Sequence, residues 1–424
     1  MHREKKMTAA YILGAYSTPF GRFSEKDHRA LAREAIEGVL RDAQLADGQR
    51  IGKTYFGSVL MHVIGQTMIR GQACLLSMME SGRLPERLPI INVEGACATG
   101  SIAFNLARKE ILAGEEDLIL AIGVEKMYDP QNPAGALKLI EGGLDHFDRE
   151  RWMRDYDKIA RQVEGSWDPK PDRSIGMDTY ALQAQAHIHQ WGTTREQIAF
   201  GAAKNHNHGA LNPNAQYRFR MTPEEVLADR PVSGPLTRAM CAPVGDGAAA
   251  ALICSKRFLD AQPAQVRERA VAIRASALSG GKFRLPGELG LSRIAADKAY
   301  KDAGLGPQDV DVAEVHDATS FCEIFQAEML RFCEVGRGGA YVASGATTLG
   351  GAKPVNVSGG LVSKGHPIAA TGLSMVHELC IQLRGEGGER QVKGARIGLA
   401  ENGGGVLGME EAICSVILLE APAH

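Results

Sequence analysis

The chain alternates short apolar runs, which are typical of buried strands, with stretches whose apolar residues recur at helical spacing. The unit at residues 90–124 contains a strand pattern, a Gly-flanked turn, an amphipathic helix starting near Thr99 and a second apolar strand. The unit at residues 355–400 repeats this order, and both units begin with Asn-Val-x-Gly and reach Ala-Thr-Gly. Two matching units predict an α/β fold built from two pseudo-symmetric halves.

Residues 126–244 separate the two repeats and break their pattern with loops rich in Pro, Gly and Asp and with polar helices. A long insertion after a strand commonly supplies substrate contacts on a rigid scaffold. The apolar run at 248–255 then returns to the first half. We therefore expect an N-terminal half at residues 1–125 and 245–268, a loop domain at 126–244 and a C-terminal half at 269–424.

Composition narrows the class of protein. The chain has 424 residues, 44% of them hydrophobic, and a formal charge of −2, so it can bury a large core and has no global field that attracts nucleic acid or an anionic membrane. No apolar stretch approaches the length of a membrane span, and the one near the N-terminus is too short for a signal peptide. The eight cysteines show no disulfide or zinc spacing, so we expect a cytoplasmic protein without metal in this chain.

Cys97 lies between the strand IINVEG and the helix that starts near Thr99. Its sulfur is expected at a helix N-terminus, where the dipole and free N–H groups lower the pKa of a thiol. Thr99 or Ser101 is expected to cap the helix. An inert core cysteine is the alternative, but a Gly-flanked corner favours exposure.

Three further groups carry candidate chemistry. His366 lies at the equivalent corner of the second repeat, so facing halves would bring it to Cys97 as a base; a loop histidine bonded to backbone is the alternative. His316 follows an apolar strand and is a candidate donor to a thioester oxygen, while Asp317 is expected to cap the next helix. Glu401 follows the strand ARIGLA and is either an acid/base group or a structural carboxylate.

The motifs NVEGACATG, VHDA, NVSGGLVSKGHPIAATG and ENGGG resemble, in order and across nearly the whole chain, those of the thiolases, particularly the sterol-carrier-protein-2 type. This resemblance implies two five-stranded mixed α/β halves in αβαβα layers with an inserted loop domain. It also implies an acyltransferase that uses acyl-CoA and CoA, and at least a dimer. Some relatives of this type work with a small zinc-ribbon/OB-fold partner protein.

The resemblance assigns roles to the candidate residues. Cys97 becomes acylated, His366 activates it, and His366 and His316 hold the thioester oxygen. The backbone N–H groups of Cys97 and Gly403 form a second oxyanion hole. Coenzyme A is expected near residues 185–245 and against the loop at Ser279, Gly280 and Lys282.

Two positions depart from the family pattern. Thiolases carry a second cysteine where this chain has Glu401, and the sterol-carrier type places one where this chain has Ala318. That cysteine shuttles a proton to the attacking thiol or the substrate α-carbon. Because neither is present, we expect that Glu401, if burial raises its pKa, replaces it.

The sequence thus predicts a degradative 3-oxoacyl-CoA thiolase of the β-oxidation type, acting on a bulky, branched or aromatic acyl chain. A condensing or C-acyl-transferring enzyme that uses the same site is the first alternative. A non-catalytic thiolase-like binding subunit is the second.

Overall fold

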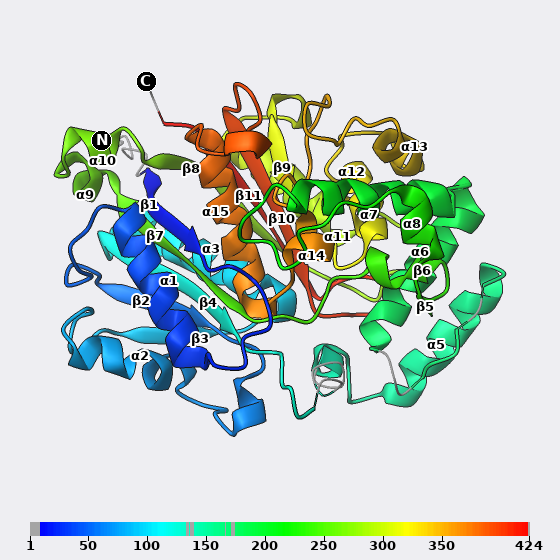
Figure 1. Cartoon of the computed structure of the whole chain (residues 1–424), viewed down its shortest axis with the longest axis horizontal. Coiled ribbons are helices and arrows are strands. Elements are labelled where there is room, and N and C mark those ends of the chain that lie inside the picture. The colour runs from blue at the N-terminus through cyan, green and yellow to red at the C-terminus, as the bar shows by residue number, and fades with distance from the viewer. Residues whose placement is uncertain (1–8, 133–134, 136–139, 166, 171–173, 423–424) are drawn as a thin grey trace, which may run out of the picture.

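The computed structural model describes residues 9–132, 135, 140–165, 167–170 and 174–422 (Figure 1). Nine strands form one mixed sheet in the order β3-β2-β4-β7-β1-β8-β11-β10-β9. These strands are β1 (Ala10–Ser17), β2 (Lys53–Gly57), β3 (Ile90–Val93), β4 (Leu118–Glu125), β7 (Gly247–Ser255), β8 (Val271–Gly280), β9 (Val312–Glu314), β10 (Ile397–Gly404) and β11 (Ile413–Glu420). A two-stranded sheet consists of β5 (Pro231–Ser233) and β6 (Leu236–Thr237).

The helices divide between the two halves and the segment between them. They are α1 (His28–Asp42), α2 (Arg70–Glu80), α3 (Thr99–Ala113), α5 (Arg149–Gln162), α6 (Ile175–Trp191), α7 (Arg195–Gly209), α8 (Pro223–Ala228), α9 (Lys256–Asp260), α10 (Ala264–Arg267), α11 (Leu291–Ala303), α12 (Ser320–Met329), α13 (Gly338–Ala343), α14 (Gly360–Lys364) and α15 (Thr371–Leu383). Within the described residues, no helix has the length and apolar character that crossing a membrane requires.

The predicted pseudo-symmetry is confirmed by the strand order. In the first half, β2 pairs in parallel with β3 and β4, and β7 pairs antiparallel with β4 and β1. In the second half, β9 pairs in parallel with β10, and β11 pairs antiparallel with β10 and β8. A parallel bridge from Ala313 to Val355 takes the place that β3 has in the first half, so the fifth strand is reduced to a single bridge.

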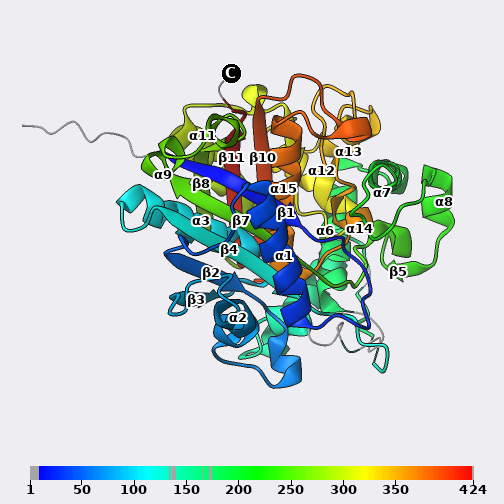
Figure 2. The same ribbon diagram turned by 60° about the vertical axis from the view of Figure 1, so that its left-hand side comes forward.

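The layers follow from which helices cover which strands. The repeat helices α3 and α15 contact each other and strands of both halves, so they form the central layer. Helices α1 and α2 cover the outer side of the first half, and α11 covers that of the second (Figures 1 and 2). Strand β7 is buried along its whole length and contains a run of four alanines, which lets helices pack closely on both faces.

The segment between the repeats forms α5–α8 beside α12 and α13, on the right of Figure 1. Its polar helices begin at clear caps: the side chain of Ser174 caps α6, and Thr194 and Gln197 form a capping box at the start of α7. The predicted strand at 248–255 is confirmed as β7, and the predicted helix near Thr99 as α3. The domain boundaries at residues 125, 245 and 269 stay a prediction.

Candidate active site

Cys97 lies in a 3₁₀ turn, Ala96–Ala98, between β3 and α3. The preceding Ala96 has a φ of 48°, a left-handed conformation that costs a non-glycine residue on the order of 1 kcal/mol and that tends to occur at functional sites. Thr99 holds this corner, because its hydroxyl accepts from Gly95 N–H at 3.0 Å and donates to the Ala96 carbonyl at 2.7 Å. The sequence expectation that Thr99 or Ser101 caps α3 is wrong. The Thr99 hydroxyl bonds the preceding residues Gly95 and Ala96, and Ser101 Oγ donates to Asn402 at 2.9 Å.

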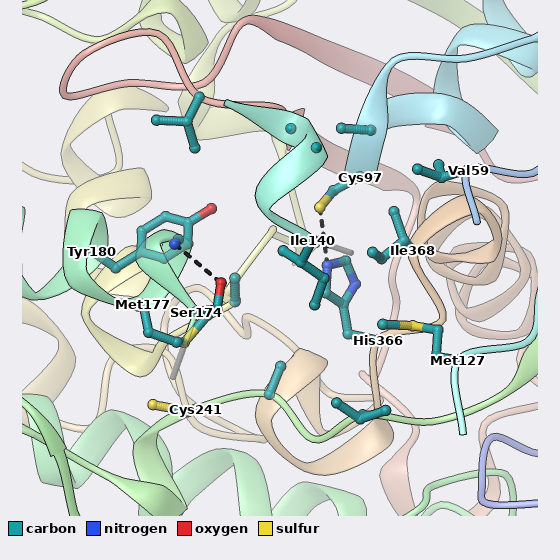
Figure 3. A pocket seen from close by; sticks show the side chains of 18 of the residues that line it. Val59, Cys97, Met127, Ile140, Ser174, Met177, Tyr180, Cys241, His366 and Ile368 are labelled. Carbon is teal, nitrogen blue, oxygen red and sulfur yellow. Dashed lines mark hydrogen bonds between the residues drawn. The ribbon is translucent and has the colours of Figure 1, made fainter. Parts of the chain in front are cut away.

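His366 comes from the second half, immediately before the 3₁₀ turn Ile368–Ala370 that leads into α15. Its Nε2 lies 3.2 Å from Cys97 Sγ (Figure 3), and its Nδ1 lies 2.7 Å from Thr371 Oγ1. The Thr371 hydroxyl donates its single proton to the Pro367 carbonyl at 3.1 Å, so it accepts from Nδ1–H. The Nε2 lone pair of His366 therefore faces the Cys97 thiol and can accept its proton.

Glycines of the repeated Ala-Thr-Gly motif explain why the two halves approach so closely. A Cβ at Gly100 of the first repeat would lie 2.7 Å from the Ala369 carbonyl oxygen of the second half. A Cβ at Gly372 of the second repeat would collide with Ser101 Oγ of the first. The absence of side chains at these positions thus lets the helix N-termini meet and places His366 against Cys97.

Burial, rather than the helix terminus, governs ionisation of this pair. The pKa of the Cys97 thiol is raised to about 12, first by burial and then by the charges of Glu411 and Glu125. The expectation of a lowered thiol pKa is therefore wrong, because loss of hydration outweighs the backbone hydrogen bond that favours the thiolate. Burial and the neighbouring His316 hold the pKa of His366 well below its usual value, so the resting pair is a neutral thiol beside a neutral imidazole.

His316 completes the cluster. Its ring centroid lies 5.2 Å from that of His366, and Cys97 Sγ and one ring nitrogen of each histidine lie within 4.8 Å of one another. Both ring nitrogens of His316 are buried without a hydrogen-bond partner in the described part of the chain, and burial lowers the pKa of this imidazole to about 4. A neutral imidazole with no partner can donate to a ligand oxygen beside Cys97, and the spacing would also suit a metal ion.

Glu401 is fully buried within β10 and not placed after the strand as expected, because β11 pairs with β10 as far as Gly404. Its carboxylate accepts from the backbone N–H of His316 at 3.1 Å and from the thiol of Cys414 at 3.2 Å. Burial, and then the charge of Glu411, raises the pKa of Glu401 to about 8. The sequence could not show that both oxygens of this carboxylate are engaged.

The glycine run after Glu401 lies against the Cys97 corner. A Cβ at Gly404 would lie 2.9 Å from the backbone nitrogen of Cys97, so this strand packs directly against the backbone of the Cys97 corner. A Cβ at Gly403 would instead meet the side chain of Glu411. An oxyanion hole formed by the N–H groups of Cys97 and Gly403 stays a prediction.

Cys97 and His366 lie on the wall of a cavity of about 840 Å³ (Figure 3). The wall is mostly apolar and combines both halves with the intervening segment. Its apolar members include Val59, Leu60, Met127, Ile140, Leu144, Met177, Val244, Ile368 and Val406. Tyr180 adds a phenol, and Lys170 and Arg230 add positive charge. An acyl chain with a polar, anionic carrier group suits this combination.

The three residues expected to bind CoA do not line this cavity. Ser279 is buried in β8 opposite Cys414, and Lys282 Nζ lies 2.9 Å from a carboxylate oxygen of Glu288. The binding of CoA at Ser279, Gly280 and Lys282 stays a prediction. Lys170 and Arg230 are both exposed cations on the cavity wall. The sequence analysis singled out neither, although Arg230 lies within the range 185–245 that it expected near CoA.

Two buried carboxyl groups hold the site together. Asp317 was expected to cap α12, but that helix begins after Thr319 without a side-chain cap. The Asp317 carboxylate instead accepts from Leu361 N–H at 2.6 Å and from Asn205 at 2.8 Å, because it faces α14 and α7. Glu125, missed from the sequence, accepts from the N–H groups of Leu60 and Ala369 at 3.0 and 3.2 Å, which ties both halves together beside the cavity.

Comparisons with known proteins place this chain among the thiolases. The family model described as thiolase, N-terminal domain matches residues 10–232, and the model described as thiolase C-terminal domain-like matches residues 289–418. Acetyl-CoA acetyltransferase of Methanothermobacter thermautotrophicus is 33% identical over 94% of this chain and 96% of its own length. Sterol carrier protein 2 of Homo sapiens is 35% identical over 92% of this chain and 69% of its own length.

Two solved structures share the fold at low sequence identity. The Ltp2-ChsH2(DUF35) aldolase superposes with a TM-score of 0.72 at 20% identity, covering 97% of this chain and 98% of that one. Acetyl-CoA acetyltransferase from Syntrophomonas wolfei gives a TM-score of 0.67 at 19% identity, covering 97% of this chain and all of that one.

Proposed function

Because the chain belongs to the thiolase family of acyltransferases, which use coenzyme A as a substrate and need no metal, we propose that it cleaves a 3-oxoacyl-CoA with CoA. The observation that carries the proposal is the 3.2 Å contact between Cys97 Sγ and His366 Nε2 on the wall of an apolar cavity. The cluster of Cys97, His316 and His366 then serves proton transfer and oxyanion binding.

The geometry supports the following course. His366 Nε2 takes the Cys97 proton as the sulfur attacks the 3-oxo carbon, so the thiolate forms only when it reacts. The backbone N–H of His316 donates to Glu401, and its ring nitrogens have no hydrogen-bond partner among the described residues, so the ring can donate to the oxygen that becomes negative. The bond between the α-carbon and the former carbonyl carbon breaks, which leaves an acyl group on Cys97. The CoA thiol then attacks this thioester, and Cys97 leaves.

We expect the acyl group to be bulky. A cavity of about 840 Å³ with a mostly apolar wall has far more room than an acetyl group fills. Side chains from the inserted segment, such as Met177 and Tyr180, form the side of the cavity across from Ile368 (Figure 3). A branched or aromatic acyl chain in a degradative reaction is the proposed substrate class.

A panel of 3-oxoacyl-CoA esters tests this proposal. With free CoA, we expect cleavage of esters with aromatic or branched acyl groups to exceed that of acetoacetyl-CoA at least about tenfold in kcat/KM, because apolar area buried in the cavity stabilises the transition state. Loss of the 3-oxoacyl-CoA absorbance and product thioesters in the mass spectrum measure the reaction. Carbon–carbon bond formation without CoA-dependent cleavage would favour a condensing enzyme, and binding without turnover would favour a non-catalytic subunit.

We also propose that the chain forms a homodimer. Large apolar side chains are exposed on and beside edge strand β3, including Ile64, Met68, Ile69 and Ile91. An edge strand with exposed apolar neighbours is a common site for pairing of two copies. Light scattering should give twice the mass of 45.5 kDa, and a Met68→Lys/Ile69→Lys variant should have a lower mass than the wild type. A monomeric wild type would contradict this proposal.

We further propose a small partner protein, by analogy with the Ltp2-ChsH2(DUF35) aldolase. Co-expression with such a partner should add further mass to the complex.

A further inference from the structure

A second carboxyl group, which the sequence analysis did not single out, lies beside the strand that carries Glu401. Glu411 precedes β11, and a Cβ at Gly403 would lie 2.7 Å from its Cγ and 2.9 Å from its Cδ. Glu401 and Gly403 are two residues apart in β10, so they share one face of the strand. The Glu411 carboxyl therefore lies one step beyond Glu401, toward the end of the strand at which Gly404 contacts the Cys97 backbone.

The backbone leading to Glu411 is held firmly. The Tyr156 hydroxyl donates to the Gly408 carbonyl at 2.7 Å, and the Arg284 guanidinium donates to the Met409 carbonyl at 2.6 Å. The neighbouring Glu410 accepts two backbone N–H bonds at 2.9 Å each. These bonds fix the backbone from which the Glu411 side chain extends. A group that transfers a proton to a substrate atom needs such a fixed position.

The two carboxyl groups differ in what they already bind. Glu401 has no exposed surface, and its oxygens accept from His316 N–H and Cys414. Glu411 retains 7% exposure, and its carboxylate interacts with its own backbone N–H instead of with a hydrogen-bonding side chain of the described residues. Its Oε1 lies 4.0 Å from the unpartnered Nδ1 of His316. Glu411 is thus the carboxyl group that can exchange a proton inside the cluster.

Burial and the charges around Glu411 favour a carboxyl group that can both give up and take up a proton. Burial raises the pKa of Glu411, the hydrogen bond from its own backbone N–H and the charge of Arg284 oppose this shift, and the charge of Glu410 adds to it. The pKa of Glu401 is also raised, in part by Glu411, so the two groups do not both ionise readily near neutral pH. Tyr180, whose pKa burial and the charge of Glu411 raise well above its ordinary value, faces the same cluster in its neutral form.

We propose that Glu411 is the acid–base group that replaces the second cysteine of the family, which deepens the proposed function and rests on it. When the bond to the former 3-oxo carbon breaks, its electron pair goes to the α-carbon, and the Glu411 carboxyl gives that carbon its proton. The resulting carboxylate then takes the proton of the CoA thiol, whose sulfur attacks the acyl group on Cys97. The Cys97 thiolate leaves and recovers its proton from His366, so every proton is accounted for.

The buried cysteines near the cluster are less suited to this task. Cys414 directs its thiol to Glu401, and burial together with that carboxylate raises the pKa of Cys414 well above its usual value. The sulfur of Cys322, in α12, lies 3.5 Å from the hydroxyl of Thr319, the residue before this helix, and burial raises the pKa of its thiol as well. Both are far weaker proton donors near neutral pH than a carboxyl group.

A Glu411→Gln variant tests the assignment with the 3-oxoacyl-CoA that the wild type cleaves fastest. We expect its turnover with CoA to fall about 100-fold, because general acid–base catalysis by one group contributes on this order. Alkylation of Cys97 by iodoacetamide should be no slower than in the wild type, because Cys97 and His366 are unchanged and loss of the Glu411 charge removes one cause of the raised pKa of the Cys97 thiol. Glu411→Asp should recover part of the activity, and circular dichroism melting shows whether each variant is folded.

The pH dependence separates proton transfer from structural damage. In Glu411→Gln, CoA-dependent release of a preformed acyl group on Cys97 should rise about tenfold between pH 7 and 8, since the free thiol ionises without a base as the pH approaches its pKa. An exposed control, Glu86→Gln, should match the wild type. The assignment is overturned if folded Glu411→Gln keeps a turnover within about threefold of the wild type. It is also overturned if Glu401→Gln loses acyl release while Glu411→Gln keeps it. Absence of any acyl adduct in the wild type would instead refute the proposed function.

Discussion

Replacement of Cys97 by alanine should abolish cleavage of 3-oxoacyl-CoA, with a loss of about 10⁴-fold or more in kcat. The thiol is the atom that becomes acylated in the proposed course, and His366 Nε2 at 3.2 Å is placed to take its proton. Substrate binding should persist, because the apolar wall of the cavity is unchanged. Mass spectrometry of the intact chain after mixing with substrate should show an acyl adduct on the wild type and none on Cys97→Ala.

Cys241 provides a matched control for adduct formation. Its thiol lines the same cavity and burial likewise raises its pKa to about 12, but its Sγ lies 3.4 Å from the Thr237 carbonyl instead of facing a histidine. Cys241→Ala should therefore still form the acyl adduct. An adduct that disappears in Cys241→Ala and persists in Cys97→Ala would exclude Cys97 as the acylated residue.

Replacement of His366 by alanine should lower turnover about 10³-fold. The Cys97 thiol has a pKa of about 12, so without a neighbouring base only about one molecule in 10⁵ carries a thiolate at pH 7. The thiolate fraction rises tenfold per pH unit below that pKa. The rate of Cys97 alkylation by iodoacetamide should consequently increase about tenfold per pH unit in His366→Ala and much less in the wild type.

His377 offers the control for loss of an imidazole. It is a partly buried histidine of α15 whose Nδ1 bonds to the Ala15 carbonyl at 3.0 Å, away from the cavity. His377→Ala should retain the alkylation profile of the wild type even if its melting temperature falls. A flat pH profile in His366→Ala would show that another group deprotonates Cys97, and His316 would be the next residue to replace.

The two pseudo-symmetric halves could be predicted because a duplicated unit repeats the same motifs and the same order of strand and helix patterns. The two Ala-Thr-Gly motifs, each between an apolar strand and an amphipathic helix, indicated two halves with facing corners. Gly100 and Gly372 provide the physical reason, since each makes room for the opposite half. The prediction that His366 and His316 meet Cys97 followed from this symmetry and from the family resemblance, and the structure brings the three side chains together.

The helix caps were predicted less well than the repeat, because local sequence does not say which distant group a side chain will meet. Asp317 has the composition of a helix cap, yet it faces Leu361 and Asn205 from segments 44 and 112 positions away in the chain. The binding of CoA at Lys282, whose ammonium group pairs with Glu288, stays a prediction. Glu125 looks like the polar end of a strand, yet it joins the two halves.

The sequence by itself determined the family, the duplicated α/β architecture and the grouping of Cys97, His316 and His366, because these depend on motif order and on apolar periodicity. The tertiary structure alone decided the protonation states and the surroundings of each carboxyl group. Burial raises the pKa of Cys97 where a helix terminus suggested the opposite, and packing engages both oxygens of Glu401. Hydration and neighbouring charge are properties of the packed chain, so no local pattern encodes them.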